Sequence, residues 1–240
     1  MNGKTVKMNP QEQPPKPPKQ KDRSALKQPG ICLQDSSIVV AEKPEGWVIY
    51  SNEPHEINHS SLQHWVQNKM GIRLFPVHRI DKDTHGLVLF ARSSKIASLV
   101  IDGFRRRAMQ KTYLTWVWGE VPLKGRFTDP LKKNKSKDKE PAVTEFARDR
   151  VIDLPAGRIS AVSVFPKTGR YHQIRRHFAM HGFPIVGDVK YGSEDQDRRL
   201  SSELSLALIA KRLEFVHPVT KKNVVVEAKI PKELQRLFSR

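Results

Sequence analysis

A carboxylate in a distinctive setting lies in the first half of the chain. Asp81 ends the segment His78-Arg79-Ile80-Asp81, and a run of apolar residues follows at 87–91. The apolar run predicts a buried strand, which would hold the carboxylate rigidly at its start. A carboxylate flanked by cationic and polar groups can serve as a nucleophile or as a general base. A structural ion pair with an arginine explains the tetrapeptide equally well.

A second polar segment covers residues 168–177. Basic and hydrogen-bonding side chains follow a glycine turn there, in the order Thr168-Gly169-Arg170-Tyr171-His172-Gln173-Ile174-Arg175-Arg176-His177. This pattern is typical of a helix start that cradles phosphate groups. His177 and His181 lie one helical turn apart, which is also a spacing that metal ligands use. No acidic residue lies between them, and we therefore expect no metal.

Several enzyme classes lack their usual motifs in this chain. It contains no Gly-x-Ser-x-Gly turn, no phosphate-binding loop and no dinucleotide-binding glycine pattern, which disfavours hydrolases, NTPases and dehydrogenases. The single cysteine, Cys32, rules out an intrachain disulfide, and we expect it to be a small buried hydrophobe. No run of the roughly 18 to 20 apolar residues needed to span a bilayer is present. We expect a cytoplasmic protein without a membrane partner.

The chain is strongly basic. It has 43 Lys and Arg against 25 Asp and Glu, which gives a net charge of +18 and predicts a polyanionic partner. Residues 1–30 are rich in Lys and Pro and hold no aromatic residue, so we expect a disordered basic tail. Residues 31–240 would form a single catalytic domain that is basic in its own right. A lysine-rich segment at 132–140 predicts a solvated loop that contacts phosphates.

The remaining pattern predicts an α+β fold with a mixed, mostly antiparallel sheet flanked by helices. Two short strands at 37–41 and 46–50 would form a hairpin through a turn at Pro44 and Gly46. The alternating segment 111–118 is a further strand. We expect the other strands at 86–91, 142–147, 158–165, 204–215 and 223–230. We expect helices at 62–70 after a serine cap, at 94–104, at 172–181 and after Pro231.

Taken together, these motifs resemble the pseudouridine synthases of the RluA type over most of residues 33–231. The motifs of that family are matched by Lys43-Pro44, His78-Arg79-Ile80-Asp81, Thr84-His85-Gly86, Lys111-Thr112-Tyr113, residues 168–175, residues 182–188 and Phe215-Val216-His217-Pro218. The resemblance implies a bisected sheet with a central catalytic cleft. It also implies that the protein isomerises a uridine in structured RNA without a cofactor.

The resemblance assigns roles to individual residues. Asp81 would be the catalytic carboxylate, which a bidentate Arg175 keeps ionised and aimed. Tyr113 would stack on the uracil, with removal of the C5 proton as a secondary role. Arg79 would fill the space left by the flipped-out uridine. Further substrate contacts are expected from His78, Thr84, Gly169, Arg170, His172, Ile174 and Arg176.

Two details bear on the substrate. His85 stands where the family usually has serine, and Ile80 where it usually has leucine. The doubled Arg175-Arg176 and segment 140–144 are most similar to the tRNA-specific C branch, so we expect a tRNA substrate first and ribosomal RNA second, and a monomeric enzyme.

Two alternatives to an isomerase are a non-catalytic basic RNA-binding or ribosome-associated protein on the same scaffold, and a metal-dependent nucleic-acid hydrolase. The joint presence of Asp81, Tyr113 and Arg175 favours the isomerase over the non-catalytic protein, because a protein that only binds has no need of all three. The hydrolase hypothesis rests on the histidines alone.

Overall fold

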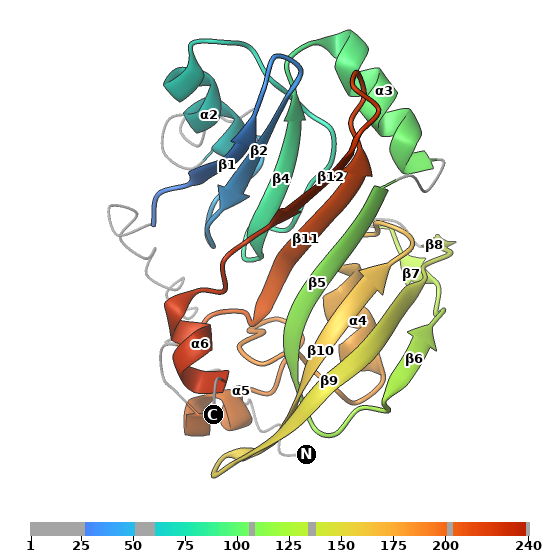
Figure 1. The fold of residues 1–240 in the computed structure, drawn as a ribbon. Helices are drawn as coiled ribbons and strands as arrows, with labels where there is room; N and C mark the ends of the chain where they lie inside the picture. The colour runs from blue at the N-terminus through green and yellow to red at the C-terminus, as the bar shows by residue number, and fades with distance from the viewer. Residues whose placement is uncertain (1–26, 51–60, 106–108, 134–137, 201–203, 239–240) are drawn as a thin grey trace, which may run out of the picture.

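The computed structural model describes residues 27–50, 61–105, 109–133, 138–200 and 204–238. Its centre is a ten-stranded sheet in the order β1-β2-β4-β11-β5-β10-β9-β6, with β3 added to β4 and β12 added to β11. The strands β4 and β11 pair in parallel, and the other pairs of this sheet are antiparallel. The predicted α+β fold with a mixed, mostly antiparallel sheet is confirmed (Figure 1).

The first half of the sheet comes from the N-terminal part of the chain. Its strands are β1 (Gly30–Gln34), β2 (Ile38–Lys43), β3 (Phe75–Pro76) and β4 (His85–Ala91), and its helices are α2 (Leu62–Met70) and α3 (Ser94–Arg105). Residues 87–91 are completely buried, as their apolar run predicts. The Ser61 hydroxyl caps α2, and Gly71 ends it in the left-handed region at φ 66°, in agreement with the sequence.

The second half comes from the middle of the chain. It is built from β5 (Met109–Trp118), β6 (Lys124–Phe127), β9 (Thr144–Leu154) and β10 (Gly157–Pro166). Helix α4 (Gln173–Met180) lies behind β9 and β10 in Figure 1. Its Phe178 ring packs edge-on against Phe127, with 5.2 Å between the ring centroids, and this contact attaches the helix to the sheet. At the two ends of the predicted lysine-rich loop, β7 (Leu131–Lys132) and β8 (Lys139–Glu140) pair in a separate two-stranded antiparallel sheet.

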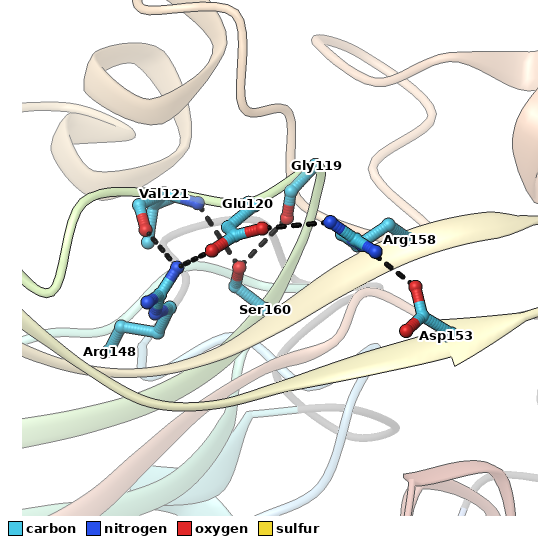
Figure 2. Close-up of polar contacts among 7 residues, drawn as sticks. All are labelled: Gly119, Glu120, Val121, Arg148, Asp153, Arg158 and Ser160. Atoms are coloured by element: carbon cyan, nitrogen blue, oxygen red, sulfur yellow. Dashed lines mark hydrogen bonds and ion pairs between the residues drawn. The ribbon is translucent and has the colours of Figure 1, made fainter.

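A polar cluster at one end of this half fastens the turn after β5 to β9 and β10 (Figure 2). The two carboxylate oxygens of Glu120 accept hydrogen bonds from Arg148 Nη1 at 2.7 Å and from Arg158 Nη1 at 2.9 Å. Arg158 Nε also donates to Asp153 Oδ1 at 2.7 Å. The Ser160 hydroxyl adds bonds to the backbone of the turn. We call these residues the Glu120 cluster.

The two halves meet at β11 (Leu208–Val216), which pairs with β5 along one edge and, along the other, first with β4 and then with β12 (Asn223–Glu227). The parallel pairing of β11 with β4 consists of Ile209 with His85 and Ala210 with Gly86. Gly86 has φ +127°, and a Cβ atom there would lie 2.4 Å from the Ala210 carbonyl oxygen, so glycine is required. The sheet is bisected at this short contact. Two short helices, α5 (Glu194–Leu200) and α6 (Lys232–Phe238), complete the described structure.

The predicted hairpin of residues 37–41 with 46–50 is wrong. Strand β2 pairs with β1 instead, and the Asp35 carboxylate holds the turn between them by accepting from the N–H groups of Ser37 and Ile38 at 2.7 and 2.9 Å. Val48 forms only an isolated bridge with Ser61. The local pattern of apolar residues cannot say which strand is the partner, and here a strand that begins within the predicted tail takes that place.

Other differences concern the chain ends and the edges of the sheet. The Lys27 carbonyl accepts from Trp47 Nε1 at 3.0 Å, so residues 27–30 belong to the folded body, while the rest of the predicted tail lies outside the described residues. Cys32 is exposed rather than buried, because it lies on the edge strand β1. Strands β1 and β6 and helix α5 were not predicted. Residues 204–207 precede β11 and are not part of it.

Candidate active site

Asp81 lies on the turn that leads into β4. The Thr84 N–H donates to the Asp81 carbonyl at 3.1 Å and closes this turn. Lys43, at the end of β2, is completely buried, and its Nζ donates to the carbonyl oxygens of Lys82 at 2.7 Å and of Pro44 at 2.9 Å. The turn is therefore tied to the end of β2. The turn that carries Asp81 is therefore fixed between the end of β2 and the start of β4.

Arg175, on α4, is 2% exposed and is hydrogen-bonded to a second carboxylate, that of Asp188. Its Nε and Nη2 atoms donate to the two oxygens of Asp188 at 2.8 and 2.7 Å. The predicted bidentate pair with Asp81 is therefore wrong, because Asp188 already occupies that side of the guanidinium. The third arm, Nη1, lies 3.7 Å from Asp83 Oδ2 and is buried without a hydrogen-bond partner among the described residues.

The charges of the site act on one another. Burial raises the pKa of Asp81, and the positive charges of Arg175 and Arg79 oppose this rise. Burial would lower the pKa of Arg175, but the hydrogen bond and charge of Asp188 raise it. Burial lowers the pKa of Lys43 to about 7, despite the nearby carboxylates. The Asp81 carboxylate and the Arg175 guanidinium are thus electrostatic neighbours, although no hydrogen bond joins them in the described structure.

Tyr113 reaches the same place through the strand register. On three adjacent strands, Tyr113 of β5 lies opposite Ala210 of β11, which lies opposite Gly86 of β4. This row brings the tyrosine beside the turn that holds Asp81. Tyr113 is 8% exposed, and its pKa is raised by burial and by the Asp81 charge. The structure therefore brings together Asp81, Tyr113 and Arg175, which are far apart in sequence.

The other predicted contacts near the turn differ in their surroundings. Thr84 is 1% exposed, and its hydroxyl has no hydrogen-bond partner in the described part of the chain. Nε2 of His78 accepts from the Leu89 N–H at 3.0 Å, and burial, followed by the Lys111 charge, lowers the pKa of His78 to about 3. His78 is thus a neutral ring that holds β4. Arg79 is exposed.

The predicted contacts on the second segment are mostly turned toward neighbouring protein groups. Arg170 forms an ion pair with Glu140 at 3.0 Å, and Arg176 donates to a backbone carbonyl of β7 at 3.0 Å. Gly169 is exposed, and Ile174 is 7% exposed within the core. A contact of these four residues with substrate stays a prediction.

His172 is the predicted contact that faces the Asp188 loop. Its Nδ1 lies 3.3 Å from the hydroxyl of Tyr191. Burial, followed by the Arg175 and Lys190 charges, lowers the pKa of His172 to about 4, so the ring is neutral near pH 7.

Two residues with central positions were assigned no role from sequence. Asp188 and Lys43 were seen only as parts of matched motifs, Gly187-Asp188 and Lys43-Pro44. A buried lysine or aspartate is rare unless it is paired, but burial is a property of the fold and not of the motif. The signal that could have found Asp188 is its position directly after the apolar pair Ile185-Val186 and a glycine.

The two histidines at a metal-ligand spacing, His177 and His181, are engaged in other contacts. His177 Nδ1 lies 2.8 Å from the Thr144 hydroxyl, and His181 Nε2 lies 2.7 Å from an Asp129 carboxylate oxygen. Within the described ranges, no group of three or more His, Cys, Asp or Glu side chains could hold a metal ion. No helix in the same ranges is long and apolar enough to cross a membrane.

A hollow of about 620 Å³ opens beside α2 and includes none of the predicted site residues. Its lining consists of Gln63, Gln67, Asn68, Gly71, Ile72 and Arg73. The predicted catalytic cleft at Asp81 therefore stays a prediction.

A bisected α+β sheet that gathers an aspartate, a tyrosine and a buried arginine at its seam is the arrangement expected of an enzyme that isomerises uridine. Residues 37–180 match the family model described as RNA pseudouridylate synthase. The chain belongs to this family. It is an RNA pseudouridine synthase, and hence an isomerase.

The curated relatives are more specific. The chain is 34% identical over 231 residues to the "tRNA pseudouridine synthase C" of Haemophilus influenzae, covering 87% of this chain and 96% of the relative. It is 33% identical over 229 residues to the protein of the same name from Vibrio cholerae, covering 87% and 94%.

Solved structures share the fold. "Human RNA Pseudouridylate Synthase Domain Containing 1" has a TM-score of 0.72 at 22% identity, covering 88% of this chain and 87% of that one. "Human RNA Pseudouridylate Synthase Domain Containing 4" has a TM-score of 0.68 at 23% identity, covering 87% and 92%.

Proposed function

We propose that this enzyme isomerises a uridine in transfer RNA. The observation that carries this substrate is the match to the "tRNA pseudouridine synthase C" of Haemophilus influenzae at 34% identity over 96% of that protein. The strong positive charge, +18, suits a folded polyanion whose phosphates are bound without regard to sequence.

The proposed chemistry moves the ribose from one atom of uracil to another. The bond from C1′ to N1 breaks, a bond from C1′ to C5 forms, C5 loses a proton and N1 gains one. Atoms and electrons balance within the substrate, so the step consumes no co-reactant. We assign Asp81 as the ionised carboxylate, which acts either as a nucleophile toward the sugar or as the base that starts elimination there.

Arg175 and Tyr113 have supporting roles in this proposal. Asp188 occupies two arms of the Arg175 guanidinium, which leaves Nη1 to stabilise the negative charge of Asp81. A tyrosine phenol is neutral near pH 7 in any case, and the raised pKa of Tyr113 makes its phenolate still harder to form. A neutral phenol is a poor base, and this supports stacking on the uracil over removal of the C5 proton.

A paired uridine hides its reacting atoms, so we propose that the enzyme flips it out of the helix. Arg79 is suited to fill the vacated space. Its side chain is exposed, it lies two residues before Asp81, and its positive charge acts on that carboxyl group. Arg79→Ala should weaken productive binding of duplex RNA, and unchanged kinetics would argue against this role.

The decisive test is to incubate the enzyme with unmodified tRNA transcripts and to map the carbodiimide-induced stops of reverse transcription. A new stop at one uridine is the expected result. Asp81→Asn should bind RNA and fold but produce no stop. Asp153→Asn is the matched control, because it makes the same change on β9, away from the candidate site, at a residue whose side chain is 74% exposed. We expect it to remain active.

The possible outcomes separate the hypotheses. Turnover by Asp81→Asn would overturn the mechanism. Stops in ribosomal RNA and none in tRNA would overturn the substrate. RNA binding without stops in either RNA would favour a non-catalytic RNA-binding protein on the same scaffold.

A further inference from the structure

A cluster of two tyrosines, a histidine and a lysine adjoins the candidate active site. We call Tyr171, His172, Lys190 and Tyr191 the Tyr–Lys cluster. Its members come from the start of α4 and from the loop after Asp188. The chemistry proposed above gives no role to Tyr171, Lys190 or Tyr191.

Asp188 ties this cluster to the active site. Besides holding Arg175, its Oδ1 accepts from the backbone N–H groups of Lys190 at 3.0 Å and Tyr191 at 3.1 Å. The guanidinium carbon of Arg175 lies 5.3 Å from the centroid of the Tyr191 ring. One carboxylate therefore fixes both the arginine and the loop, and a group bound by the cluster would lie beside Arg175.

The rings are held in a defined arrangement. Tyr171 stacks on His172 with 3.8 Å between centroids and an angle of 18°, and His172 meets Tyr191 edge-on at 5.7 Å. The His172 backbone lies in the left-handed region at φ 49°, which costs an L-residue about 1–2 kcal/mol. This residue stands at the N-cap of α4, yet its side chain makes no capping bond. Its side chain makes the ring contacts of the cluster instead.

Lys190 supplies an uncompensated positive charge. Its Nζ lies 5.3 Å from the centroid of Tyr171 and 5.4 Å from that of Tyr191. The nearby phenol groups, first Tyr191 and then Tyr171, raise the pKa of Lys190. The side chain is exposed and forms no ion pair with a carboxylate of the described residues. A lysine held between two phenols has a restricted position and a charge open to a ligand.

We propose that the Tyr–Lys cluster binds a backbone phosphate of the RNA next to the target uridine, with Lys190 providing the charge and the two tyrosine hydroxyls providing hydrogen bonds. The proposal rests on the proposed function for its substrate. Phosphate oxygens accept from ammonium and phenol donors alike. Stacking of a base on Tyr171 is disfavoured, because His172 already covers one face of that ring.

The test measures binding of a tRNA transcript in an Asp81→Asn background, so that turnover does not interfere. Lys190→Gln should raise Kd about tenfold at low salt, as expected for loss of one charge-assisted contact. The slope of log K against log salt should fall in magnitude by about 0.7–0.9, the value for one phosphate. Lys190→Arg should keep most of the affinity, because it keeps the charge.

Lys69→Gln is the matched control. Lys69 also lies over an aromatic ring, with its Nζ 5.0 Å from the centroid of Trp65, but it is on α2. The same loss of charge there should leave Kd and the salt slope unchanged. If Lys190→Gln behaves like this control, the proposal is overturned.

Two tyrosine variants distinguish phosphate binding from stacking. For a phosphate site, Tyr171→Phe should weaken binding, since it removes only the hydroxyl. Loss of affinity in Tyr171→Ala, with normal affinity in Tyr171→Phe and Lys190→Gln, would show that a base stacks here and would overturn the proposal.

A substrate with a methylphosphonate beside the mapped uridine locates the contact. It should weaken binding to the Asp81→Asn enzyme but not to the Lys190→Gln variant made in that background, and equal losses in both would overturn the assignment to that phosphate. Failure of isomerisation in the stop-mapping test would refute the proposed function separately, since binding is measured without turnover.

Discussion

Glu120 and Asp81 each lie near two arginines, but the two carboxylates are in opposite environments. Glu120 is at the surface and accepts hydrogen bonds from Arg148 and Arg158 (Figure 2). These bonds, that of Arg148 first, lower the pKa of Glu120. Asp81 is near Arg175 and Arg79, yet burial raises the pKa of Asp81 in spite of them. Two neighbouring arginines therefore accompany a lowered pKa at Glu120 and a raised pKa at Asp81. The direction depends on whether the carboxylate is exposed and directly hydrogen-bonded or buried.

The two regions also differ in whether their polar groups have hydrogen-bond partners. In the Glu120 cluster, both carboxylate oxygens of Glu120 have an arginine donor. At the candidate site, Arg175 Nη1 and the Thr84 hydroxyl are buried without a hydrogen-bond partner among the residues described. Each such group costs about 1–3 kcal/mol of folding free energy. The polar groups near Asp81 thus keep unused hydrogen-bonding capacity, whereas the carboxylate of Glu120 is fully bonded within the protein.

The largest expected effect comes from removing the carboxylate that pairs with the buried arginine of the candidate site. Asp188→Asn leaves the Arg175 guanidinium, which is 2% exposed, without its carboxylate. We expect a loss of about 3–5 kcal/mol in the free energy of unfolding, because the buried guanidinium loses the one carboxylate that accepts hydrogen bonds from it among the described residues. Urea denaturation at pH 7 measures this loss. An unchanged midpoint would show that Arg175 does not depend on Asp188.

A smaller effect, of opposite sign, is expected at Thr84. Replacing its unbonded hydroxyl by a methyl group in Thr84→Val should stabilise the protein by about 1–3 kcal/mol, while turnover falls if the hydroxyl binds substrate. Thr115→Val is the matched control, since the buried Thr115 hydroxyl donates to the Ala207 carbonyl at 2.8 Å. It should destabilise by about 1 kcal/mol. Denaturation curves that show stability changes of the same sign in the two variants would contradict this account.

The pH dependence of stability tests the raised pKa of Asp81. A carboxyl group whose pKa is raised on folding destabilises the native state once pH exceeds its unfolded value near 3.8. Asp81→Asn should therefore be more stable than the wild type at pH 7, and the difference should vanish below that value. Turnover of the wild type should rise with pH through the raised pKa. A wild type that is the more stable of the two at pH 7 would contradict the shift.

The smallest effect is expected at the Glu120 cluster. Glu120→Gln removes an exposed charge whose bonds are screened by water and salt. We expect a barely measurable change in the denaturation midpoint, which disappears in high salt, and no change in turnover. A clear loss of turnover would show that this end of the molecule contacts the substrate.

The sequence predicted the elements whose signals are local. The serine cap and terminal glycine of α2, the apolar run of β4 and the alternation of β5 were each sufficient. The partner of β2 was not predictable, because strand pairing depends on contacts outside the strand itself. The same limit applies to the candidate site. Asp81, Tyr113 and Arg175 were recognised by motif, whereas the partner of Arg175 is fixed by the packing around Asp188.

The short parallel contact between β4 and β11 also limits which substitutions the enzyme can accept. Two residue pairs make that contact, and the row from Tyr113 through Ala210 to Gly86 crosses it. The spacing between the tyrosine and the turn of the acid is thus set by main-chain geometry. One added methyl group at residue 86 would lie 2.4 Å from the Ala210 carbonyl oxygen, and it would push β4 away from β11 and the turn of Asp81 away from Tyr113.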